Sequence, residues 1–77
     1  MVTILSSNHL KFKINENDHN PPHVHVEGLG ATVRINLITL EVMDSRTDFN
    51  KSTVNRIIEF VKLNQQHLLD KWEETHD

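Results

Sequence analysis

The chain has 77 residues, a formal net charge of −3 with neutral histidines, two glycines and no cysteine. This length predicts one domain with a thin core, and the lack of cysteine excludes disulfides and thiolate metal sites. The net charge and the scattered lysines and arginines disfavour a nucleic-acid partner, and two glycines are too few for a glycine-rich phosphate loop. Without a membrane-length apolar run or a signal-sequence pattern, we expect a soluble, cytoplasmic protein.

Alternation of polar and apolar residues predicts the strands of a small antiparallel sheet. The expected strands span residues 9–14, 23–27 and 31–37, with a short fourth strand at 40–43. Their inward side chains would be Leu10, Phe12, Ile14, Val24, Val26, Ala31, Val33, Ile35 and Leu37. A tight turn at Gly28-Leu29-Gly30 joins the second and third strands. Residues 1–7 leave two alternatives open, an edge strand or a disordered segment.

Helical spacing predicts one long C-terminal helix from Lys51 to about Glu74, with Asn50 as its N-cap. Its apolar stripe, which should cover the sheet, consists of Val54, Ile57, Ile58, Val61, Leu68 and Trp72, with Gln65 as the one polar gap. The expected fold is therefore α+β, a three- to four-stranded antiparallel sheet packed on this helix. Away from the stripe, Phe60, Leu63 and His67 predict a second face for a partner or a second copy.

A single helix can cover only one face of the sheet. The opposite face is therefore expected to be polar and open to solvent. It would carry Lys11, Lys13, His23, His25, Glu27, Thr32 and Arg34. We interpret this face as the functional surface. A nucleic-acid contact through Lys11, Lys13 and Arg34 is disfavoured by the negative net charge.

Three of the six histidines lie between residues 18 and 28, around Pro21 and Pro22. The prolines predict a stiff, non-helical entry to the strand, and alternation places His23 and His25 on one side, roughly 6.5–7 Å apart. These two residues with His19 or Asp18, and with Glu27, could bind a divalent metal such as zinc. The alternatives are a solvated strand face, or acid–base chemistry for which no companion nucleophile is evident.

The residues from Asn17 to Gly28, the apolar strand that follows and the helix ending in Leu68-Leu69-Asp70-Lys71-Trp72-Glu73 resemble a known family. The chain is similar to the bacterial domain-of-unknown-function family 4160. The resemblance is carried by the motif Asp18-His19-x-Pro21-Pro22-His23-x-His25-Val26. It implies a small cytosolic bacterial protein with no established activity, whose gene often lies beside that of another small protein in an arrangement like a toxin–antitoxin pair.

Two functions follow as hypotheses. The first is a noncatalytic protein-interaction module, as in a toxin–antitoxin-like pair, whose partner is an adjacent small protein or a second copy. The second is a metal-binding protein or metal-dependent enzyme built on His19, His23 and His25. The residues expected to bind a partner or ligand are Lys11, Lys13, Asp18, Pro21, Pro22, Glu27, Arg34, Phe60, Leu63 and Trp72. No membrane or nucleic-acid partner is expected, and no residue is assigned a catalytic role.

Overall fold

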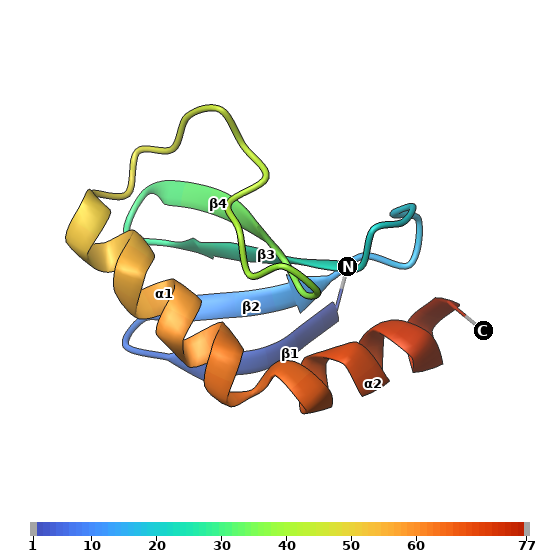
Figure 1. Cartoon of the computed structure of the whole chain (residues 1–77). Helices are drawn as coiled ribbons and strands as arrows, with labels where there is room; N and C mark the ends of the chain where they lie inside the picture. Colours follow the sequence, from blue (N-terminus) through green and yellow to red (C-terminus); the bar gives the residue numbers. More distant parts are fainter. Residues whose placement is uncertain (1, 77) are drawn as a thin grey trace.

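The structure, a computed structural model, describes residues 2–76 and has four strands followed by two helices. The elements are β1 (Val2–Ser7), β2 (Leu10–Ile14), β3 (His23–Gly28), β4 (Ala31–Asn36), α1 (Lys51–Leu63) and α2 (Gln65–His76). The strands form one antiparallel sheet in the order β1-β2-β3-β4, and α1 crosses one of its faces (Figure 1). The predicted α+β class is therefore confirmed. Within the described residues, neither helix has the length and apolar character needed to cross a membrane.

The expected alternation of the strands is confirmed by burial. The buried apolar strand residues are Leu10, Phe12, Ile14, Val24, Val26, Val33 and Ile35, and Leu37 directly after β4 is buried too. Ala31, also predicted to face inward, is only half-buried because it is the first residue of β4 and directly follows the turn between β3 and β4. Leu29 and Gly30 form that two-residue turn with φ of 54° and 78°, the type I′ geometry that matches strand twist.

Residues 40–43 do not form the predicted fourth strand. They make one isolated bridge, between Val42 and Ile35, because Leu40 has a φ of 64° and turns the chain away from an extended path. The fourth strand is instead β1, which pairs with β2, while Met1 lies outside the described residues. The segment after β4 still covers the edge of the sheet, since the Met43 amide donates to the Arg34 carbonyl at 2.9 Å.

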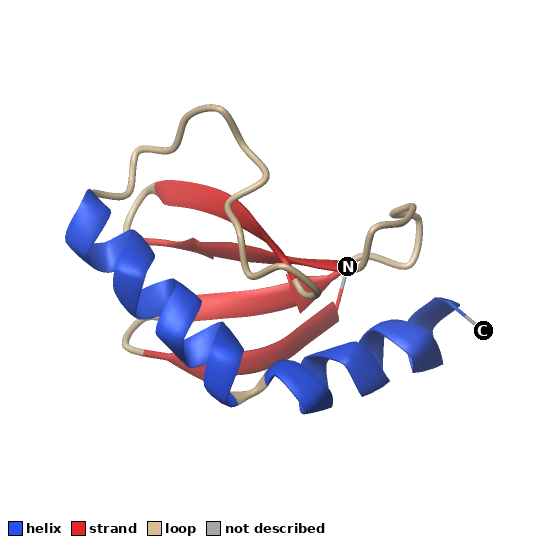
Figure 2. Cartoon of the chain, in the orientation of Figure 1, coloured by secondary structure: helices blue, strands red, loops and turns tan. Residues whose placement is uncertain are grey.

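The prediction of one long helix is wrong, because the helix breaks at Asn64 (Figure 2). The N-cap is confirmed, since Asn50 Oδ1 accepts a hydrogen bond from the Thr53 amide at 2.8 Å. At the break, the Asn64 side-chain amide donates to the Phe60 carbonyl at 2.8 Å, and Asn64 has a non-helical φ of −112°. Such side chains compete with the helical hydrogen-bond pattern. The break lets α2 run past the end of the sheet.

The helix stripe packs on the sheet as predicted, with Ile57, Val61, Leu68 and Trp72 buried. Phe60, however, does not belong to a separate outer face. Its ring centroid lies 4.8 Å from that of buried Phe12, so it packs against the core. Of the proposed second face, Leu63 and His67 remain exposed.

Candidate metal centre

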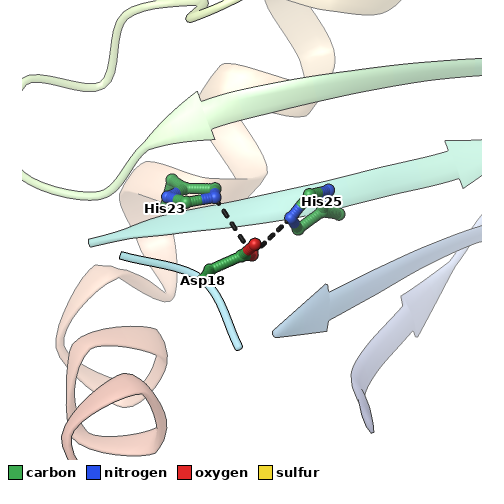
Figure 3. Close-up of side chains that lie close together, drawn as sticks. All are labelled: Asp18, His23 and His25. Carbon is green, nitrogen blue, oxygen red and sulfur yellow. Dashed lines mark hydrogen bonds and ion pairs between the residues drawn. The ribbon is translucent and has the colours of Figure 1, made fainter. Parts of the chain in front are cut away.

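Asp18, His23 and His25 come together where the loop after β2 enters β3. The loop turns at residues 15–18, where the Asp18 amide donates to the Asn15 carbonyl at 3.1 Å. It then passes through a cis Asn20–Pro21 peptide bond and Pro22 into β3. Figure 3 shows the Asp18 carboxylate pointing from this loop toward both imidazole rings of the strand.

One carboxylate oxygen serves both histidines. Asp18 Oδ2 lies 2.6 Å from His25 Nε2 and 3.1 Å from His23 Nε2. The three atoms that these residues offer as metal ligands all lie within 4.8 Å of one another. The imidazoles themselves are tilted neighbours with ring centroids 5.1 Å apart. Two nitrogen atoms and one oxygen atom therefore converge on a single small volume.

The two histidines differ in burial, which corrects the expectation that both project from an open face. His25 keeps a quarter of its side chain exposed, whereas His23 is buried to 5% exposure. The ring centroid of Trp72 from α2 lies 5.3 Å from that of His23. The ring of His76 stacks on Trp72, with centroids 3.8 Å apart. The break at Asn64 explains the difference, because it brings α2 to the start of β3 (Figure 1).

The backbone selects which nitrogen of His23 faces Asp18. His23 Nδ1 lies 2.8 Å from the Pro21 carbonyl oxygen. A carbonyl only accepts, so Nδ1 carries a hydrogen and donates it. In the neutral ring, Nε2 then has a lone pair directed at the Asp18 carboxylate. That contact becomes attractive when Nε2 carries a hydrogen as well or when a cation lies between the two groups.

The charge state of Asp18 suits either arrangement. Partial burial raises the pKa of Asp18, but the hydrogen bonds and positive charges of His25 and His23 outweigh it and lower the pKa below 3.8. The side chain is therefore an anion at neutral pH, which is the form that binds metal ions.

Three other charged residues of the polar face, Lys13, Glu27 and Arg34, are engaged in ion pairs outside this cluster. Glu27 pairs with Lys13, whose hydrogen bond lowers the pKa of Glu27 below its ordinary value of 4.5. Arg34 binds Asp44 at 2.8 Å through both Nε and a terminal guanidinium nitrogen. Glu27 is thus not brought to the two histidines as a further ligand.

The structure brings Asp18, not His19, to the two strand histidines. His19 is exposed in the same loop and does not belong to the cluster. Lys11 and Pro21 are exposed and Pro22 is half-buried near the site. The sequence did not predict the contact between His23 and the Pro21 carbonyl, because no sequence pattern indicates which backbone carbonyl a histidine will bind. The four-residue spacing of Trp72 and His76 was a detectable signal, because it places both on one helix face.

Comparison with protein-family models gives a match over most of the chain. A family model described as a domain of unknown function (DUF4160) covers residues 9–73. No curated protein and no solved structure matches the chain. Because the matched region spans most of the 77 residues, the chain belongs to the domain-of-unknown-function family DUF4160.

Proposed function

We propose that the protein binds a divalent transition-metal ion of the zinc class through Asp18, His23 and His25. The observation that carries the proposal is the convergence of two Nε2 atoms on one carboxylate oxygen. The His23 tautomer set by Pro21 supports it, because that tautomer presents a lone pair and not a hydrogen to the carboxylate. A metal ion would accept the lone pairs of both rings and neutralise the carboxylate.

The two separations between Asp18 and the histidines fit such an ion after a small adjustment, and all three ligand atoms already lie within 4.8 Å of one another. In a tetrahedral zinc site with bonds of 2.0–2.1 Å, neighbouring ligand atoms lie about 3.3 Å apart. The distance of 3.1 Å between His23 and Asp18 is already close to this value. The 2.6 Å between His25 and Asp18 must open by about 0.7 Å. His25 and Asp18 are only partly buried, so they can move while His23 stays in place.

The surroundings of the cluster resemble the outer shell that orients ligands in metal sites. A metal-binding histidine commonly donates its other N–H to a backbone carbonyl, as His23 does to Pro21. Three protein ligands leave a fourth position for water or an anion, the arrangement of catalytic zinc sites. Two imidazoles and one carboxylate also suit iron(II), which is therefore a second ion to test.

The test is zinc binding by protein purified without an affinity tag and stripped with a chelator. Calorimetric titration near pH 7.5 should give one ion per chain with a Kd below roughly 10 μM, and His25→Ala should weaken it at least about 100-fold. His19→Ala is the matched control, since His19 lies in the adjoining loop outside the cluster. Circular dichroism should show that both variants fold. Equal weakening by the two substitutions, or no binding of zinc, iron(II) or nickel(II) by the wild type, would refute the proposal.

We also propose a protein-interaction role, as a second and independent function. The observation that favours it is the exposure of large apolar side chains, 57% for Ile38 and 82% for Leu63. An adjacent-gene partner, including one in a toxin–antitoxin-like pair, stays a prediction. Copurification with the product of the neighbouring gene would test it.

A further inference from the structure

A hollow with an apolar floor lies at the end of the sheet opposite the Asp18 loop. There the β1–β2 turn and the β3–β4 turn face the first half of α1 (Figure 1). The hollow measures about 400 Å³, and Leu10, Phe12, Ile57 and Phe60 line it from the core. This volume is within the range of small-molecule sites. We call this feature the turn groove.

The walls of the turn groove are held rigidly. Asn8 and His9 have φ of 50° and 67°, so the β1–β2 turn has both central residues in the left-handed region, as the β3–β4 turn does. The two turns also pack closely, because a Cβ at Gly28 would lie 2.4 Å from the His9 carbonyl oxygen. Only glycine fits this approach, and its φ of 152° also favours glycine. The groove is therefore already formed without a ligand.

Leu29, which lines the groove, is unfavourable for the backbone conformation at its position. It occupies the first central position of the type I′ turn, where asparagine or glycine is favoured, with a φ of 54°. Its side chain is 71% exposed, so it gains little burial in return. A strained residue that presents apolar surface to a cavity indicates a contact with a ligand.

Arg56 supplies the only charge among the residues that line the groove. No acidic residue lines it, and Arg56 makes no ion pair with any residue between 2 and 76. A guanidinium beside an apolar floor favours a ligand with a carboxylate at one end and a hydrocarbon body. Polar groups of Thr53 and Ser7 at the same hollow add hydrogen-bonding capacity.

We infer that the turn groove binds a small apolar carboxylate, such as a medium-chain fatty acid. The hydrocarbon lies against Leu29 and Phe60, and the carboxylate binds Arg56. This site lies at the other end of the sheet from the proposed metal centre and does not depend on it.

Decanoate is the probe, titrated into the full chain below its micellar concentration and followed by amide chemical shifts. We expect a saturable shift of groove residues with a Kd of about 1 mM or lower. Arg56→Gln should weaken binding at least about fivefold, and decanol should bind correspondingly weaker than decanoate. Arg46→Gln, at an exposed arginine outside the groove, is the control and should leave the Kd unchanged.

Leu29→Asn distinguishes a ligand contact from a structural role. It should raise the melting temperature, because asparagine suits the turn, and at the same time weaken decanoate binding at least about threefold. The inference is overturned if decanoate gives no saturable shift by about 5 mM. It is equally overturned if decanol binds as well as decanoate, or if Arg56→Gln and Leu29→Asn bind decanoate like the wild type.

Discussion

At the scale of single residues, Asp18 connects the two strand histidines. One of its oxygens contacts both Nε2 atoms, so its ionised form is favoured in the folded chain. A hydrogen on the Nε2 atom of either ring makes its contact with Asp18 attractive, whereas a metal ion in the proposed site would bind the lone pairs of both Nε2 atoms. Metal binding at this site would therefore require both Nε2 atoms to be free of hydrogen.

The metal-free protein should lose stability in acid through Asp18. Its folded pKa lies below 3.8, so ionised Asp18 stabilises the fold above that pH, and the contribution is lost as pH falls through the folded value. Urea unfolding with a chelator present should show wild type more stable than Asp18→Asn near pH 5. The difference should shrink below about pH 3.8. Asp48→Asn, at an exposed position, is the control. A pH-independent difference would contradict the role of ionised Asp18.

How far the sequence predicts this site depends on the residue. His23 and His25 are placed on one strand by period-two alternation, a local property. The choice among Asp18, His19 and Glu27 as the third group was not accessible, because the path of a loop depends on hydrogen bonds such as that from Asp18 to Asn15. The burial of His23 could not be predicted either, because it depends on Trp72, which comes from a helix distant in sequence.

At the scale of secondary structure, the break between α1 and α2 is the feature that the periodic pattern concealed. The apolar stripe continues in sequence from Val61 to Leu68, so its spacing reads as one helix. Gln65, the polar gap in that stripe, follows the break and donates to the Leu37 carbonyl at 2.7 Å. That carbonyl is partly enclosed by the sheet and the helix. The side chain thus ties the start of α2 to the end of β4.

Gln65→Ala should therefore lower the free energy of unfolding by about 1–2 kcal/mol, because the Leu37 carbonyl loses its partner. Gln66→Ala is the matched control. Gln66 is exposed and its amide contacts only Asp70 one turn later, so its loss should cost at most about 0.5 kcal/mol. Urea unfolding followed by circular dichroism measures both. Equal effects would show that the Gln65 contact does not hold α2.

At the scale of the whole molecule, a thin core leaves apolar surface uncovered. Leu63, at the end of α1, is 82% exposed, and Ile38 after β4 is 57% exposed. In a chain of this size such residues favour association, either with a partner or with a second copy. The charges of the polar face do not promote this association, because Lys13 and Arg34 are already paired with acidic residues of the same chain.

Self-association should consequently depend on Leu63. Sedimentation velocity at about 100 μM should show a concentration-dependent dimer for wild type, and Leu63→Ser should reduce it because the apolar contact is lost. Lys62→Ser, at the neighbouring exposed position, should leave the dimer unchanged. If the wild type stays monomeric at this concentration, self-association through Leu63 is excluded, and only a different protein could contact this side chain.

The proposed metal centre links distant parts of the chain, since Asp18 and His23 belong to the first half and Trp72, which contacts His23, belongs to the last helix. An ion that binds only the folded protein should stabilise the whole domain, by about 2.7 kcal/mol at a zinc concentration of 100 times Kd. For a domain of this size, that corresponds to a melting temperature roughly 10–20 °C higher. Trp72, the single tryptophan, reports the same event through its fluorescence, because its ring lies 5.3 Å from His23. Thermal unfolding with and without zinc should show the increase in wild type and none in His25→Ala. An equal increase in that variant would place the ion elsewhere on the molecule and separate zinc binding from the packing of α2.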